Sequence, residues 1–145
     1  MSGVDSSCGV GVPCARLAAM VVGGGGGERL GGVSKPDLVF GGVRLVDRVC
    51  CALGEVADAG VVAIVPPSVR VPSGVTRTLE EPPGGGPLAG IDAGLAALSV
   101  GADCWVIVVS VDCPGIADIL RYLLAEPLGI ACDGRILRGG DPEPL

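Results

Sequence analysis

A nearly unbroken apolar run, Trp-Val-Ile-Val-Val-Ser-Val at residues 105–111, constrains the fold of this chain more than any other segment. Such a run of β-branched residues is typical of a parallel strand that is covered on both faces, because a half-exposed strand alternates apolar and polar residues. We therefore expect a central strand at residues 105–111. Its parallel neighbours need crossover connections, which are usually helices.

Shorter segments supply the remaining elements of such a sheet. Apolar runs predict further strands at residues 15–22, 61–65 and 129–137, and a weak alternation predicts one at 75–81. Helical periodicity predicts helices at 44–55, 87–98 and 116–124. In the middle helix, the residues expected to form one apolar face are Leu88, Ile91, Leu95 and Leu98. The order of these elements predicts an α/β fold with an open, mostly parallel sheet.

Composition and charge exclude several classes of protein. The 145 residues suffice for one domain, with residues 1–14 as a loose leader, and the net charge of −6 argues against a nucleic-acid partner. No apolar run reaches the roughly 18 residues that a membrane-spanning helix needs, and we expect a cytoplasmic protein without a membrane partner. The seven cysteines are odd in number and the chain has no histidine, so we expect buried, reduced thiols rather than a zinc site.

The glycine-rich segment between Val22 and Lys35 carries the clearest chemical signal. Five consecutive glycines follow the first predicted strand, and Arg29 precedes Lys35 by six positions. Backbone N–H groups of glycines can approach phosphate oxygens closely, and the two cations can neutralise the phosphate charge. The segment therefore predicts a phosphate-binding loop, with a flexible linker as the alternative interpretation.

Asp112 follows the predicted central strand and is the candidate metal ligand. A carboxylate at the end of a buried strand suits Mg²⁺, which takes one or two protein oxygens and leaves its other positions to water and phosphates. Alternatively, Asp112 only caps the following turn. The neighbouring acids Glu80 and Glu81 are interpreted as a solvated strand end rather than as paired catalytic carboxylates, and Cys113 lacks a histidine that could activate it as a nucleophile.

The absence of histidine also limits the reaction. Attack by an existing phosphate oxyanion on the α-phosphorus of a nucleotide requires alignment and charge neutralisation more than a general base. Glycine amides, Arg29, Lys35 and a metal ion on Asp112 are sufficient for such a transfer.

Several motifs together resemble the molybdenum cofactor guanylyltransferase family of nucleotidyltransferases. They are Val22-Gly23-Gly24-Gly25, Arg29-Leu30-Gly31, Ser34-Lys35, Gly86-Pro87-Leu88-Ala89-Gly90 and Asp112-Cys113-Pro114. The fourth motif is the most specific, since a glycine loop with Arg and Lys is shared by many sugar nucleotidyltransferases. The likeness extends from about residue 17 to about residue 135.

The resemblance implies a Rossmann-like three-layer sandwich, with residues 15–145 as a nucleotidyltransferase-like domain that is shorter at its C-terminal end than family members. It implies that Lys35 and Arg29 act in catalysis, that Asp112 binds Mg²⁺, and that the nucleotide contacts are Val22, Gly23, Gly24, Gly25, Lys35, Gly86, Pro87, Leu88, Ala89 and Gly90. The family joins GMP from GTP to the terminal phosphate of molybdopterin cofactor and releases pyrophosphate. A molybdoenzyme or a cofactor chaperone is the protein partner that this reaction implies.

Three positions depart from the family pattern. Ser34 replaces an acid, Gly23 replaces an alanine, and Gly115 replaces a bulky residue. Two alternatives therefore stay open beside the guanylyltransferase: an accessory protein that binds the nucleotide with weak or no turnover, and a nucleotidyltransferase that acts on another phosphate acceptor.

Overall fold

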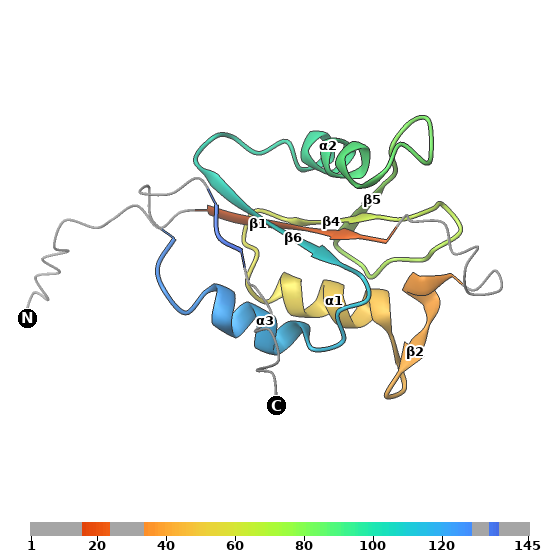
Figure 1. Ribbon diagram of the computed structural model, residues 1–145, viewed down its shortest axis with the longest axis horizontal. Coiled ribbons are helices and arrows are strands. Elements are labelled where there is room, and N and C mark those ends of the chain that lie inside the picture. Colours follow the sequence, from red (N-terminus) through yellow and green to blue (C-terminus); the bar gives the residue numbers. More distant parts are fainter. Residues whose placement is uncertain (1–15, 24–33, 129–133, 137–145) are drawn as a thin grey trace, which may run out of the picture.

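The computed structural model of the chain describes residues 16–23, 34–128 and 134–136. A parallel sheet of four strands in the order β5-β4-β1-β6 forms its middle layer (Figure 1). The strands are β1 (Arg16–Val22), β4 (Val61–Ile64), β5 (Val75–Thr78) and β6 (Cys104–Ser110). Helix α2 (Pro87–Leu98) covers one face, and helices α1 (Leu45–Gly54) and α3 (Ile116–Leu123) cover the other. This arrangement confirms the predicted Rossmann-like three-layer α/β sandwich.

The core is aliphatic and divided by the sheet. Along β1, Ala19 and Val21 belong to the larger cluster on the side of α1 and α3, whereas Met20 belongs to the smaller cluster under α2. All three side chains are fully buried, because β1 has a hydrogen-bonded neighbour on each side and helices on both faces. In the described part of the chain, no helix is both long enough and apolar enough to span a membrane.

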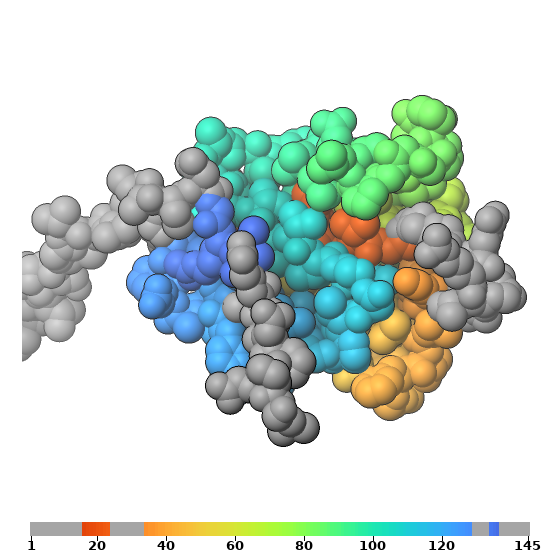
Figure 2. All heavy atoms as spheres, in the orientation of Figure 1, coloured from red at the N-terminus to blue at the C-terminus, as the bar shows by residue number. Residues whose placement is uncertain are grey.

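The prediction that residues 105–111 form the central strand is wrong in one respect. Strand β6 pairs with β1 along its whole length but lies at an edge of the four described strands, and Val108 is 45% exposed. Figure 2 shows the cyan atoms of β6 at the surface, between the green atoms of α2 and the blue atoms of α3. The two interior positions belong to β4 and β1, and β1 has fewer β-branched residues than β6.

The apolar face predicted for α2 is correct at two of its four positions: Ile91 and Leu98 pack against the smaller core cluster, but Leu88 and Leu95 do not. Leu88 and Leu95 are 81% and 43% exposed, whereas the buried positions of the helix are Gly90 and Gly94. A Cβ on Gly94 would lie 2.9 Å from the Ile64 Cδ1 atom, so the helix approaches β4 too closely for a larger residue at this position. Gly90 and Gly94 therefore make the closest approach of α2 to the sheet, and Ile91 and Leu98 pack beside them.

Helix α1 confirms the prediction made for residues 44–55. Its apolar residues recur at helical spacing and are buried in the larger cluster: Leu45, Val46, Val49, Cys50 and Leu53. Helix α3 confirms the third predicted helix, with Ile116 and Leu120 buried on the same side of the sheet.

A short hairpin and a turn of 3-10 helix precede α1, and neither was predicted. The 3-10 helix η2 spans Lys35–Asp37, and strands β2 (Val39–Phe40) and β3 (Val43–Arg44) pair antiparallel. Gly41 and Gly42 form the turn between them with φ angles of +59° and +81°, which L-residues with side chains rarely adopt. Strands of two residues are too short to produce an alternating pattern.

Three further predictions either differ from the structure or lie partly or wholly outside the described residues. Strand β5 ends at Thr78, three residues earlier than predicted. Within the predicted strand at 129–137, residues 134–136 belong to no helix or strand, and the remainder lies outside the described residues. The predicted leader at residues 1–14 also lies outside them.

The two adjacent cysteines of α1 differ in exposure. Cys50 is buried in the core and Cys51 is exposed, so the prediction of buried thiols is correct for the first and wrong for the second. Burial raises the pKa of the Cys50 thiol to about 12, with a smaller contribution from the nearby Asp47 carboxylate. In the unfolded chain the thiol has its ordinary pKa of 9.0. The neutral Cys50 thiol therefore stabilises the fold fully below pH 9.0, and this stability is lost as the pH rises from 9.0 towards about 12.

We predict that iodoacetamide at about pH 8 alkylates Cys51 well before Cys50, because the thiolate is the reactive species and burial suppresses it. Fragment mass spectra of the peptide that contains both residues would assign the label. Equal labelling rates in the folded chain would contradict the burial of Cys50.

Candidate functional site

The carboxyl ends of three strands meet at one edge of the sheet. The Val111 N–H donates to the Val22 carbonyl at 3.0 Å, and the Gly23 N–H donates to the Ile64 carbonyl at 3.0 Å. These bonds hold together the residues that follow β1, β4 and β6. Ligands of open parallel sheets bind at this edge, so the candidate site is built here.

Gly23 lets the segment that carries Lys35 pack against the end of β1. A Cβ on Gly23 would lie 3.0 Å from Val65 Cγ1 and 3.1 Å from Pro36 Cγ, closer than most side-chain contacts allow. Pro36 is buried and directly follows Lys35. The missing side chain of Gly23 therefore helps to determine where Lys35 lies.

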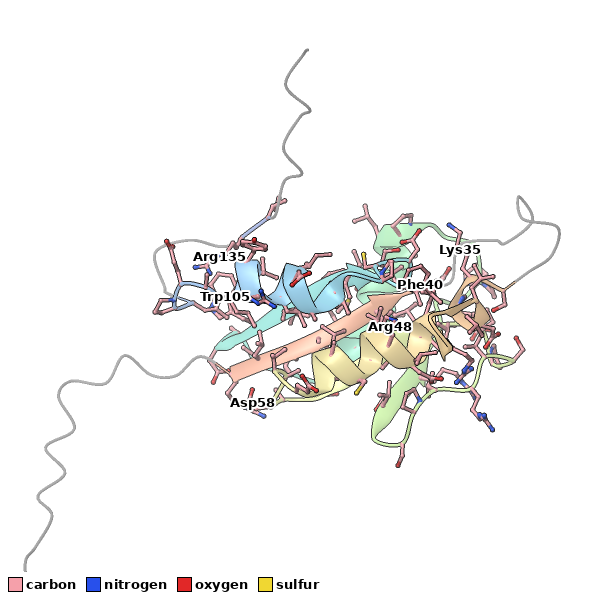
Figure 3. All side chains as sticks on the ribbon, turned by 90° about the horizontal axis from the view of Figure 1, so that it is seen from below. Lys35, Phe40, Arg48, Asp58, Trp105 and Arg135 are labelled. Carbon is pink, nitrogen blue, oxygen red and sulfur yellow. The ribbon has the colours of Figure 1, made fainter. Side chains whose placement is uncertain are left out.

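Two predicted site residues, Lys35 and Asp112, lie side by side at this edge. The Lys35 Nζ atom lies 3.6 Å from Asp112 Oδ2, and the two side chains are 43% and 51% exposed. Figure 3 shows Lys35 at the end of the sheet opposite Asp58, that is, at the carboxyl ends of the strands. An ion pair this exposed contributes little to stability, and both groups are accessible to a ligand.

Ser110 is a further member of the site that sequence reasoning missed. Its hydroxyl donates a hydrogen bond to Asp112 Oδ1. This hydrogen bond, together with the Lys35 ammonium, holds the pKa of the Asp112 carboxyl below its usual range, although partial burial opposes the effect. One signal in the sequence could have revealed Ser110: it precedes Asp112 by two positions at the end of a strand. Alternate residues of a strand face the same side, so the two side chains are expected to be neighbours.

Asp112 fits the chemistry of a magnesium ligand. It is ionised at neutral pH, half-exposed, and offers hard oxygen donors. No group of three or more histidine, cysteine, aspartate or glutamate residues occurs in the described part of the chain that could enclose a metal ion. A single half-exposed carboxylate suits an ion that takes its other ligands from water and phosphate oxygens.

A second side chain that was not predicted, Arg44, ties η2 to the rest of the fold. Its guanidinium donates to Asp37 Oδ1 at 2.8 Å, to both carboxylate oxygens of Asp47 at 2.8 Å, and to the Arg70 carbonyl at 2.9 Å. The hydrogen bond to Asp47, supported by the one to Asp37, raises the pKa of Arg44 above its ordinary value. Partial burial opposes this effect but does not cancel it. Because Asp37 shares η2 with Lys35, this network holds the lysine near the sheet.

The glycine-rich motif at residues 86–90 forms the start of α2. Gly86 is the N-cap and Pro87 the first helical residue, as predicted, while Ala89 is partly buried and Leu88 extends into solvent. The motif follows β5, whose carboxyl end lies at the same edge as those of β4 and β1. Gly90 faces β4 closely, since a Cβ on it would lie 3.4 Å from Ile64 Cγ2.

Glu80 corrects the interpretation of the two adjacent acids as a solvated strand end. Glu81 is exposed, but Glu80 is only 9% exposed and its Oε1 atom accepts a hydrogen bond from the Gly84 N–H at 3.1 Å. The chain leaves β5 at Thr78 and turns, which brings Glu80 under the loop before α2. Three other predicted site residues, Gly24, Gly25 and Arg29, lie outside the described residues.

The fold is an α/β domain with a candidate site at the carboxyl ends of its strands, and comparison with known proteins gives its family. Residues 19–140 match the family described as the MobA-like NTP transferase domain, and the chain belongs to that family. Three curated relatives from Cereibacter sphaeroides, each named molybdenum cofactor guanylyltransferase, are 37% identical to this chain over 101 residues. The match covers 68% of this chain and 51% of each relative, so the chain spans about half the length of the relatives it matches.

Proposed function

We propose that this chain is a nucleotidyltransferase that joins GMP from GTP to the terminal phosphate of molybdopterin cofactor and releases pyrophosphate. The observation that carries the proposal is the approach of Lys35 Nζ to Asp112 Oδ2, 3.6 Å, at the carboxyl edge of a parallel sheet. Membership of the family and the name of the Cereibacter sphaeroides relatives support this choice of reaction. Residues 15–145 are the proposed catalytic domain.

The proposed transfer is a displacement at the α-phosphorus of GTP. A terminal phosphate oxygen of the acceptor forms a bond to that phosphorus, and the bond from the phosphorus to the oxygen bridging the α- and β-phosphates breaks, so that pyrophosphate leaves. The attacking oxygen is already an anion, and the chain, which has no histidine, needs to supply alignment and positive charge rather than a strong base.

Different residues of this chain align the nucleotide and supply the positive charge. Lys35 neutralises charge on the triphosphate, with Arg29 and the amides of Gly24 and Gly25 as further phosphate contacts after Val22. The predicted contact of the Gly23 amide is not retained, because its N–H donates to the Ile64 carbonyl. Residues 86–90, at the start of α2, seat the nucleoside. Asp112 holds Mg²⁺ through its ionised carboxylate, and the metal would reduce the repulsion between the phosphates and the incoming anion.

The cytoplasm is the proposed compartment, and the four described cysteines support it because all of them are free thiols. The product is a cofactor that has to be passed on, so a molybdoenzyme or a cofactor chaperone is the proposed protein partner.

A nucleotide screen tests the proposal at the level of binding. We predict that GTP with Mg²⁺ raises the midpoint of thermal unfolding more than CTP, UTP or ATP with Mg²⁺, because binding to the folded state alone stabilises it by about 2.7 kcal/mol at a hundredfold excess over Kd. The same samples with EDTA are the control, and they should show a much smaller shift. A chain that responds to none of the four nucleotides would contradict the proposal.

A transfer assay tests the reaction. Pyrophosphate release should require GTP, Mg²⁺ and molybdopterin cofactor together. Binding of GTP and Mg²⁺ without release would instead indicate an accessory protein that holds the nucleotide, and release that requires a sugar phosphate would indicate a different acceptor.

A further inference from the structure

We propose that Glu80 is a positioning residue, whose buried carboxylate holds the glycine loop at residues 84–86 in the conformation from which α2 begins. The inference rests on the proposed function only in taking residues 86–90 as the segment that seats the nucleoside. It assigns a role to a side chain that no motif of the family resemblance includes.

The burial of Glu80 is the first observation. It is the one charged side chain that is buried in the described part of the chain, and its neighbour Glu81 is exposed. Removing a carboxylate from water is unfavourable unless hydrogen bonds replace the lost solvation. None of the four ion pairs among the described residues includes Glu80, so its stabilisation comes from polar contacts such as the one with the backbone of the loop.

The contacts of Glu80 reach both the loop and the helix that follows it. Oε1 accepts the Gly84 N–H at 3.1 Å. The Cγ atom lies 3.9 Å from the position a Cβ would take on Gly85, and Oε2 lies 3.7 Å from that position on Gly90, in the first turn of α2. One side chain therefore bonds the beginning of the loop and lies close to the end of the motif at residues 86–90.

The loop depends on such support because its own residues restrict it little. Gly84 and Gly86 have φ angles of +89° and +86°, and a Cβ on Gly85 would lie 2.8 Å from the Cβ of Ala89. Glycine is therefore favoured at all three positions, yet three consecutive glycines have many other conformations available. Gly86 also caps α2 without a side-chain hydrogen bond, so the carboxylate of Glu80 supplies an anchor that the loop residues lack.

The structure thus predicts a particular kinetic signature. Loss of the Glu80 carboxylate disorders the segment that seats the nucleoside but leaves Lys35 and Asp112, which come from other elements, in place. The KM for GTP should rise, by about tenfold if one hydrogen bond to a charged group is lost, while kcat changes little.

Three variants of Glu80 and one control test this inference. We expect Glu80→Ala and Glu80→Asp to raise the KM for GTP, because the first removes the acceptor and the second is too short to reach Gly84. Glu80→Gln keeps a carbonyl oxygen at the same distance and should retain most of the affinity. Glu55→Ala, which removes the same charge from an exposed position after α1, is the matched control.

Amide hydrogen exchange of Gly84, measured without nucleotide, gives a second readout. We expect exchange at least about tenfold faster in Glu80→Ala and Glu80→Asp than in the wild type and in Glu80→Gln. If Glu80→Ala fails to fold, the Asp and Gln variants still decide the inference. Unchanged exchange and an unchanged KM in Glu80→Asp would overturn the inference. It would also be overturned if Glu80→Gln had normal Gly84 exchange but a KM as high as that of Glu80→Asp, because the nucleotide would then need the negative charge itself.

Failure of the proposed function gives a different result. In that case the wild-type chain would either bind no GTP or bind it without releasing pyrophosphate, and no KM for GTP could be measured. The exchange rate of the Gly84 amide would still report whether Glu80 holds the loop.

Discussion

Replacing Asp112 by asparagine is expected to lower the rate of pyrophosphate release by at least about a hundredfold, the loss typical of removing one electrostatic stabiliser from an active site. Asparagine has nearly the same shape but no negative charge to hold Mg²⁺. The free energy of unfolding should change by less than about 1 kcal/mol, because the ion pair that the substitution breaks joins two half-exposed side chains.

Asp118→Asn is the matched control for this substitution. Asp118 forms an exposed ion pair with Arg121 on α3, at 3.1 Å, and neither residue belongs to the candidate site. Its loss should leave the transfer rate within about twofold of the wild type. A transfer rate of Asp112→Asn as high as that of Asp118→Asn would show that Asp112 does not hold the metal.

Substitution of Leu53 by alanine is expected to destabilise the fold by about 2–5 kcal/mol, the usual range for removing a buried leucine side chain. Leu53 is fully buried in the larger core cluster and comes from the last turn of α1. Urea unfolding, followed by circular dichroism, measures this loss as a lower midpoint at an unchanged slope.

Leu88→Ala removes the same atoms from a side chain that is 81% exposed. Its free energy of unfolding should stay within about 0.5 kcal/mol of the wild-type value, as is usual for surface substitutions. Equal losses in the two leucine variants would mean that Leu88 packs against the rest of the chain, and would contradict the exposed face of α2.

The layers of the fold are predictable from the sequence because they depend on local patterns. Apolar runs and helical spacing gave β1, β4, β6 and the three helices, since each pattern reports which faces of its own segment are covered. Strand order is different, because the composition of residues 105–111 does not show whether a further strand lies beside them. The buried positions Gly90 and Gly94 of α2 were missed for a related reason. They bring the helix so close to β4 that Leu88 and Leu95 lie outside the contact, whereas Ile91 and Leu98 pack on the core as predicted.

The approach of Lys35 and Asp112 was predictable because residues that follow neighbouring parallel strands meet at one edge. Glu80, Ser110 and Arg44 were not, because their roles depend on contacts between loops. In the sequence Glu80 and Glu81 are equivalent acids before two prolines. Only the turn after Thr78 places one of them under the glycine loop and the other in solvent.

The central claim is that Lys35 and a metal ion on Asp112 together hold the phosphates of a nucleotide. Titration calorimetry of GTP with Mg²⁺ into the wild-type chain, Lys35→Ala and Asp112→Asn tests it most directly. We predict metal-dependent binding to the wild type and affinities at least about tenfold weaker in both variants, since each loses a charge-assisted contact to phosphate. Wild-type affinity in both variants would contradict the claim.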